Sequence, residues 1–319
     1  MNKTLFLGAV LIAMTGGSAG VNAENADILP TGKTYTVNGV SFTMITIPAV
    51  TDGTLGYGEY DVNPAHMVSL PAYRIGETEV TQELWQAVMG NNPSGFNGND
   101  EETKPAGGEE QKKRPVEMIN WYQAIAFCNK LSLKLGLEPC YTVTVKGKPI
   151  DFASLPFDKI PSEKYMSEKE TAVKAWDAVT VDISKNGFRL PSEAEWEWAA
   201  KGGAESRWAG TDNEEEVDRY MWHDGNSENR THEVKKLKPN GYGLYDMSGN
   251  VLEFCWDWFA DYTEQKKEVR YTGPAYGSKR VSRGGSVSEY TPFINAGDRY
   301  AFDPNEAYDY MGFRIAGNE

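Results

Sequence analysis

Cysteine and histidine are scarce in this chain, with three of each among 319 residues. Cys128, Cys140 and Cys255 are an odd number, so at most one disulfide can form within the chain. A turn-forming stretch, 136–139, could bring Cys128 and Cys140 together, but buried free cysteines are the common alternative. No cysteines or histidines have the spacing of a metal-binding cluster, which argues against a zinc or thiolate site.

Positive charge and long apolar runs are also lacking. The chain has 32 Lys and Arg against 46 Asp and Glu, a net charge of −14, so phosphate backbones and anionic lipids would repel it. We therefore expect no nucleic acid partner. No run approaches the roughly 20 apolar residues that span a bilayer, so we expect no membrane insertion.

The N-terminus has the pattern of a secretory signal peptide. A lysine at position 3 precedes the apolar run Leu5–Ala13, and small residues follow up to Ala23. No cysteine stands behind the run for lipid attachment. We predict a signal peptide over 1–23 and a soluble, exported product in the periplasm, at the cell surface or outside the cell.

No internal repeat or low-complexity linker divides the rest of the chain. We expect a short linker over 24–34 and a single domain over 35–319. The Lys- and Glu-rich stretch 146–178 is expected to be a surface insertion. Strands are predicted at Tyr35–Phe42, Met44–Ile47, Tyr141–Val145 and Val179–Ile183.

Capping residues and apolar spacing predict three helices. Thr81 is a suitable N-cap for Gln82–Met89. Ser192 and Glu195 form a capping box for a helix that follows Pro191. The helix Trp121–Leu135 carries an apolar stripe typical of a core. Few short helices, short strands and much coil predict an α+β domain.

Residues 240–258 form the most informative block of the chain. Its Asn-Gly and Gly-Asn pairs favour positive φ, so the backbone should coil and expose carbonyl oxygens. The carboxylates of Asp246 and Glu253 and the carbonyls of Gly249 and Val251 would form an oxygen-only site, which suits calcium better than zinc or copper. The alternative is a tight turn followed by an aromatic core strand.

This block, with pieces elsewhere, resembles the formylglycine-generating, sulfatase-modifying-factor family. The other matching pieces come in family order and are Tyr73–Trp85, Arg114–Trp121, Ala126–Asn129, Gly187–Ala200, Arg280–Ser286 and Gly312–Arg314. The resemblance implies a variant of the C-type lectin fold with small antiparallel sheets and much ordered coil. It also implies structural Ca²⁺ at the four residues above, although the family has Asn at the position of Asp246.

The resemblance does not imply the family's oxidase activity. Those enzymes hold copper with two cysteines, one three residues after the Ser of Arg-Gly-Gly-Ser and one five residues further on. Here Glu289 and Ile294 occupy these positions, and no cysteine follows Cys255. Neither side chain offers the soft thiolate that Cu(I) prefers, so we expect no copper and no formylglycine formation.

An enzyme of the same superfamily with different chemistry is the alternative. Glu289 and Asp298 are candidate acids for it. Another branch of the superfamily, resembling the sulfoxide synthases, uses iron bound by histidines. In this chain, His66, His223 and His232 lie far apart and lack the spacing of an iron site.

Residues 287–311 replace the catalytic segment between the matching pieces. They are rich in Tyr, Phe, Ser, Asn and Asp, the composition of antibody-like binding surfaces, and resemble the variable region of retroelement-diversified proteins on this scaffold. We predict that they bind a protein or glycan ligand; the alternative is an ordinary loop with aromatic packing. The predicted ligand-binding residues are Ser288, Glu289, Tyr290, Phe293, Asn295, Asp298, Tyr300, Phe302, Asp303, Asn305, Tyr308, Asp309 and Tyr310. If the end of the segment is extended, Tyr308 and Tyr310 share one side and Asp309 faces the other.

Overall fold

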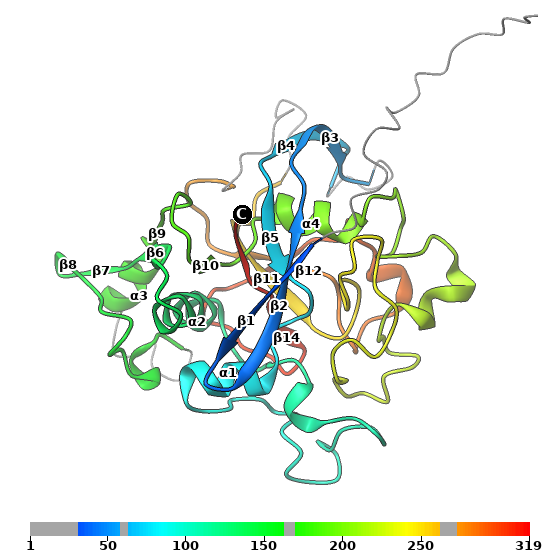
Figure 1. Ribbon diagram of the computed structural model, residues 1–319, viewed down its shortest axis with the longest axis horizontal. Coiled ribbons are helices and arrows are strands. Elements are labelled where there is room, and N and C mark those ends of the chain that lie inside the picture. The colour runs from blue at the N-terminus through cyan, green and yellow to red at the C-terminus, as the bar shows by residue number, and fades with distance from the viewer. Residues whose placement is uncertain (1–30, 58–62, 163–169, 262–272) are drawn as a thin grey trace, which may run out of the picture.

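The computed structural model describes residues 31–57, 63–162, 170–261 and 273–319 (Figure 1). The predicted signal peptide, and the predicted linker up to residue 30, lie outside the described residues. Among the described helices, none combines the length and the apolarity needed to cross a membrane.

The larger sheet has five strands in the order β1-β2-β5-β15-β10, and all its neighbours are antiparallel. Its strands are β1 (Gly32–Val37), β2 (Val40–Ile47), β5 (Tyr73–Gly76), β15 (Ala316–Asn318) and β10 (Phe188–Arg189). The prediction of one strand over Tyr35–Phe42 was wrong. Asn38 and Gly39 have φ of 48° and 82° and make a hairpin turn there, as an Asn-Gly pair favours.

The second sheet has four strands in the order β13-β12-β11-β14. They are β13 (Tyr300–Phe302), β12 (Arg280–Arg283), β11 (Leu252–Trp258) and β14 (Met311–Gly312). Only β11 and β14 are parallel. Residues 287–311 therefore follow β12 in the chain and include β13, which pairs with β12 at one edge of this sheet. They end at β14, which forms the opposite edge of the same sheet.

Three short strand pairs complete the described β-structure. They are β3 (Val50–Leu55) with β4 (His66–Leu70), β6 (Tyr141–Thr142) with β9 (Thr180–Val181), and β7 (Thr144–Val145) with β8 (Lys148–Pro149). The strands predicted at Tyr141–Val145 and Val179–Ile183 are thus broken or shorter. Val143 turns into the core, where it is fully buried and its carbonyl accepts a hydrogen bond from Ile150 N.

The predicted helix caps are confirmed. Thr81 accepts a hydrogen bond from Leu84 N, and Ser192 and Glu195 form the capping box. The helices are α1 (Gln82–Met89), α2 (Trp121–Lys134), α3 (Glu170–Asp177) and α4 (Glu193–Lys201), and the 3₁₀ segments are η1 (Gln111–Lys113), η2 (Phe157–Lys159), η4 (Glu214–Arg219) and η5 (Thr291–Phe293).

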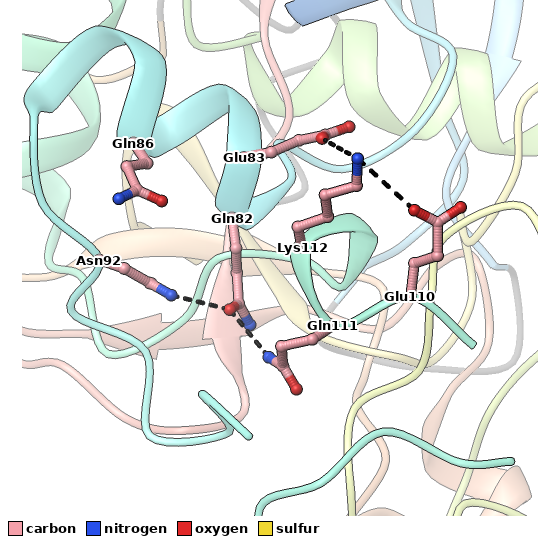
Figure 2. A pocket seen from close by; sticks show the side chains of 7 residues that line it. All are labelled: Gln82, Glu83, Gln86, Asn92, Glu110, Gln111 and Lys112. Atoms are coloured by element: carbon pink, nitrogen blue, oxygen red, sulfur yellow. Dashed lines mark hydrogen bonds and ion pairs between the residues drawn. The ribbon is translucent and has the colours of Figure 1, made fainter. Parts of the chain in front are cut away.

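The polar side of α1 lines an open cleft of about 460 Å³ (Figure 2). On its floor, Asn92 and Gln111 both donate to Gln82 Oε1, at 2.9 and 3.0 Å. Gln82 and Gln111 also donate to the carbonyl of Phe96, at 3.1 and 2.6 Å. Because these amides satisfy one another, the floor is a closed hydrogen-bond network that holds the loop after α1.

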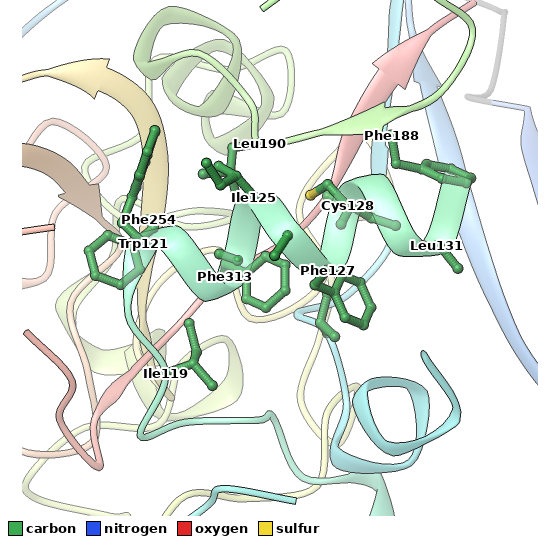
Figure 3. Close-up of a cluster of buried hydrophobic side chains, with 14 of the residues drawn as sticks. Ile119, Trp121, Ile125, Phe127, Cys128, Leu131, Phe188, Leu190, Phe254 and Phe313 are labelled. Atoms are coloured by element: carbon green, nitrogen blue, oxygen red, sulfur yellow. The ribbon is translucent and has the colours of Figure 1, made fainter. Parts of the chain in front are cut away.

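The main core surrounds α2 (Figure 3). The predicted stripe of Trp121, Ile125, Cys128 and Leu131 is fully buried there. Trp121 Nε1 donates to the carbonyl of Cys255 on β11 at 2.9 Å, which fastens the helix to the second sheet. Cys128, Cys140 and Cys255 are all buried and free.

We had expected stretch 146–178 to be a surface insertion, but part of it is buried. Phe152, Ile160 and Trp176 from this stretch are buried in the main core. Trp176 packs edge-on against Tyr122 of α2, with ring centroids 5.9 Å apart. The few apolar residues among many charges therefore anchor the stretch to α2.

Candidate functional site

A buried arginine ties the segment 287–311 to the scaffold. Arg283, the last residue of β12, pairs with Glu197 of α4. Its Nη1 donates to the carbonyls of Gly297 and Asp298 at 2.8 and 2.6 Å. Because a charged donor makes strong hydrogen bonds to carbonyl groups, Arg283 fixes the middle of the segment to the sheet.

The backbone of the segment is held at intervals along its length. Main-chain hydrogen bonds to the scaffold are Val287 N to Asn250 O, Asp224 N to Glu289 O, Ala296 N to Arg207 O, Trp121 N to Pro304 O, Met118 N to Tyr308 O and Leu252 N to Tyr310 O, all between 2.7 and 3.1 Å. Such bonds do not depend on the side chains that the segment carries. The path of the backbone is therefore set largely without these side chains.

Two aromatic side chains project from an anchored turn, η5. Tyr290 and Phe293 are 65% and 61% exposed. Beneath them, Ile294 is buried beside Trp208, whose Nε1 donates to the carbonyl of Thr291 at 2.9 Å. The Tyr300 hydroxyl donates to the carbonyl of Phe293. The turn thus presents two large rings on a fixed base.

Four further aromatics of the segment lie half-buried against the main core: Tyr300, Phe302, Tyr308 and Tyr310. Phe302 and Tyr308 have ring centroids 5.8 Å apart, and Tyr308 stacks on Tyr310 at 5.1 Å with 6° between the planes. Asp309 between the two tyrosines is exposed. The two tyrosines share one side as expected, but residues 309–310 form a turn rather than an extended strand. The predicted aromatics divide into an exposed pair and a packed group.

The polar residues of the predicted surface also divide. Ser288 and Asp309 are exposed, and Asp303 and Asn305 are half-buried. Asn295 is only 1% exposed, so we remove it from the surface. Its Oδ1 accepts the Gly297 N–H at 2.9 Å and closes a turn instead.

The two candidate acids for catalysis cap turns of the segment. The carboxylate of Glu289 accepts the N–H of Ser286, and Asp298 Oδ2 accepts the N–H of Asn295 at 3.0 Å. Burial raises the pKa of both carboxyls. Each acid therefore has a structural role in the segment.

Cysteine chemistry is not supported at this site. Ile294, at the second copper position, lies in an apolar cluster with Trp208, Val217 and Met221. Burial raises the pKa of the Cys140 thiol to about 11 and that of Cys255 well above its ordinary value. Buried, protonated thiols are poor metal ligands and nucleophiles.

The three histidines have separate partners. His232 stacks on Trp222 with centroids 3.7 Å apart and contacts Glu109 through Nδ1 at 2.9 Å. His223 contacts Asp218 through Nε2 at 2.7 Å, and His66 contacts the carbonyl of Pro64 through Nδ1 at 2.8 Å. No group of three His, Cys, Asp or Glu side chains within the described ranges is placed to hold a metal.

The predicted calcium ligands lie around Arg314. Its Nε and Nη2 donate to the two carboxylate oxygens of Glu253, each at 2.6 Å. Asp246 Oδ2 accepts the N–H of Lys235 at 2.8 Å. Gly249 has φ of 78°, and a β-carbon there would lie 2.0 Å from the carbonyl oxygen of Trp222, so only glycine fits this turn.

Negative charge is in excess around Arg314. Glu79, Asp246 and Glu253 are all buried beside this single arginine. Burial, followed by the charges of Asp246 and Glu253, raises the pKa of Glu79 well above its ordinary value. Burial raises the pKa of Asp246 to about 6. A bound cation would relieve this excess of negative charge, and calcium at Asp246, Gly249, Val251 and Glu253 stays a prediction.

Two residues of this surface were missed, one beside the segment and one within it. Met118 is 39% exposed and adjoins Tyr308, and it has φ of 55°, which is unusual for a residue other than glycine. Neither property leaves a signal in the sequence. Glu306, by contrast, is an acid within the segment, and the composition argument that selected Asp303 and Asp309 applies to it equally.

A family model, the Sulfatase-modifying factor enzyme 1-like domain, matches residues 29–319. Among curated proteins, "Chaperone protein LppX" of Paenibacillus barcinonensis is 38% identical over 208 residues, which are 60% of this chain and 64% of that protein. The formylglycine-generating enzyme of Streptomyces coelicolor is 36% identical over 160 residues, 45% of this chain and 51% of the enzyme. The matches thus span half to two thirds of these relatives.

A solved structure, "Treponema denticola variable protein 1", is similar over almost the whole chain. The two chains are 56% identical, and the match covers 91% of this chain and all of the other, with a TM-score of 0.84.

Proposed function

The chain belongs to the sulfatase-modifying factor enzyme 1-like family, and from that premise we propose that it is an exported binding protein whose segment 287–311 forms the ligand surface. The family scaffold would serve here to hold this segment. The proposed ligand is a protein or a glycan.

One observation carries the proposal. The backbone of the segment is anchored to the scaffold by main-chain hydrogen bonds, while Tyr290 and Phe293 project from it into solvent. Exposed aromatic residues on a rigid base supply contact area at a low cost in conformational entropy. Anchoring of this kind also tolerates a change of side chain, since the bonds belong to the backbone.

The relatives support a binding role from a second direction. The similar solved structure is described as a variable protein, and one curated relative is named a chaperone. Neither name denotes an oxidase. Export is proposed from the signal-peptide pattern of residues 1–23.

A random peptide library tests the binding role. A phage-displayed dodecapeptide library is panned on the purified wild-type protein, and selected peptides are measured by calorimetry on the wild type and on the double variant Tyr290→Ala/Phe293→Ala. We expect enriched peptides that bind the double variant at least about tenfold more weakly, as for interface anchors. No enrichment, or equal affinity for both proteins, would overturn the proposal.

Mass spectrometry tests the absence of oxidase activity. With Glu289 and Ile294 at the copper positions, a cysteine-containing sulfatase peptide incubated with the protein and copper should keep its mass. A copper-dependent loss of mass above the protein-free control would restore the enzyme alternative and require a different ligand set.

A further inference from the structure

Acidic side chains accompany Tyr310 in the segment. Asp309 directly precedes it, and Glu306 lies four residues earlier, where its carboxylate accepts the N–H of Asp303 at 2.9 Å. Besides burial, the charges of Asp309, Glu289 and Glu306 raise the pKa of Tyr310. Tyr310 also stacks on Tyr308 at 5.1 Å. An aromatic face flanked by carboxylates attracts a cation both to the ring and to the acids.

Three acids at this end of the segment lack a basic partner among the described residues. Asp303, Glu306 and Asp309 form no ion pair with a Lys, Arg or His in the part of the chain that the structure describes. Arg299, the only basic residue of 287–311, is engaged with Glu193, with Nε and Nη2 at 2.5 and 2.9 Å from its carboxylate oxygens. Within the described residues, the surface therefore presents negative charge that no basic side chain pairs with.

The loop beside Asp309 is held from two sides. The Glu117 carboxylate accepts the N–H groups of Gly95 and Phe96 at 2.9 and 3.0 Å. On the other side, Gln82 and Gln111 of the amide network in Figure 2 donate to the carbonyl of Phe96. A loop fixed in this way loses little conformational freedom when a partner binds against it.

Met118 extends the surface beyond the segment. A β-carbon on Gly95 would lie 3.5 Å from Asp309 Cβ and 3.6 Å from Met118 Cγ, so the three residues meet at one place. Met118 N donates to the carbonyl of Tyr308 at 2.9 Å. An exposed apolar side chain thus stands next to an exposed acid.

We propose that the patch of Glu306, Tyr308, Asp309, Tyr310 and Met118 takes a lysine or arginine side chain from a protein partner. The apolar stem of such a side chain packs on Met118 and the rings, and its charged end meets the carboxylates. This inference rests on the proposed function and names the chemistry of its ligand. Anionic partners are repelled by the same carboxylates.

The peptides selected on the wild-type protein provide the probe. For each peptide, a second version is made in which every Lys and Arg is replaced by Gln. We expect Lys and Arg to be enriched in the selected sequences. The Gln versions should bind at least about tenfold more weakly at low salt, and the difference should shrink as salt is raised. Equal binding of the two versions would overturn the inference.

Matched variants test where on the protein the basic side chain of the peptide binds. Asp309→Asn should weaken binding of the basic peptides about fivefold to tenfold. Asp52→Asn makes the same charge change at an exposed residue of β3, at the other end of the molecule from α1 (Figure 1), and should leave binding unchanged. An equal effect of the two variants would contradict the location.

Met118→Asn separates contact from stability. Asparagine tolerates the left-handed backbone better than methionine, so the melting temperature should not fall while peptide binding weakens. Unchanged binding would remove Met118 from the patch. If selected peptides lose affinity on Tyr290→Ala/Phe293→Ala but not on Asp309→Asn or on loss of their basic residues, the binding function stands and this inference fails.

Discussion

Acids of the scaffold and acids of the segment 287–311 have different surroundings. Glu195, Glu197 and Glu253 are buried, and each is paired with a buried arginine. Asp303, Glu306 and Asp309 lie at the surface without such a pair among the described residues. The comparison teaches that charge in the scaffold is used to hold the fold, whereas these three acids of the segment lack such a pair, and we propose that they are left for a partner. The predictions below test this division.

The largest effect is expected at Arg314. Arg314→Met keeps much of the side-chain volume but leaves Glu253 buried without its partner, next to Glu79 and Asp246. Breaking a buried pair in this way costs about 3–5 kcal/mol of unfolding free energy. Urea unfolding measures the loss.

Arg219→Met is the matched control, since Arg219 forms an exposed pair with Glu216. It should cost less than about 1 kcal/mol. If both variants unfold at the wild-type midpoint, the buried arginines do not hold the scaffold.

A smaller loss is expected at Phe302. It is half-buried, packs against the main core and contacts the ring of Tyr308. Phe302→Ala should cost about 2 kcal/mol, less than for a fully buried phenylalanine. Phe302→Leu, which keeps most of the apolar contact, should cost clearly less, and equal losses would argue against a packing role.

Calcium removal tests the predicted site at Asp246, Gly249, Val251 and Glu253. An ion that binds only the folded protein stabilises it by mass action, so a chelator should lower the melting temperature, and elemental analysis of the untreated protein should find calcium. The same chelator should leave Glu253→Gln unaffected. An unchanged melting temperature together with no detectable calcium would disprove the site.

The dependence of stability on pH tests the buried acid Asp257. Burial, followed by the charge of Glu193, raises the pKa of Asp257 from 3.8 to about 8. Between these values the folded state keeps a proton that the unfolded state loses, so stability present at acid pH is lost as the pH rises toward 8. Asp257→Asn is neutral throughout and can still accept the Glu193 N–H, so it should flatten this decline.

Melting curves from pH 5 to pH 9 provide the measurement. Burial also raises the pKa of Glu117 to about 7, so a weaker decline should persist in the variant. Parallel curves for wild type and Asp257→Asn would show that Asp257 does not titrate in this range.

Local signals predicted the scaffold well and the segment only in part. Thr81, Ser192 and the stripe on α2 depend on neighbours in sequence, and all three predictions were confirmed. The prediction of one strand over Tyr35–Phe42 was wrong because it did not take account of the Asn-Gly pair, which forms a turn.

Composition predicted which segment forms the surface, but it could not predict which residues of that segment are exposed and which are buried. Whether Asn295 closes a turn or faces solvent depends on Gly297 and on the fold around it, which no residue pattern shows. The exposure of Met118 depends on contacts with residues almost 200 positions away in the chain. Burial within an irregular segment is set by tertiary packing, so the sequence alone could not divide the aromatics.

The variant expected to lose the least stability provides the most direct test of the central claim. The melting temperature of Tyr290→Ala/Phe293→Ala is compared with those of the wild type and of Phe302→Ala. Because both rings are more than half exposed, the double variant should melt close to the wild type and well above Phe302→Ala. A fall as large as that of Phe302→Ala would show that Tyr290 and Phe293 support the core, and would contradict a displayed binding surface.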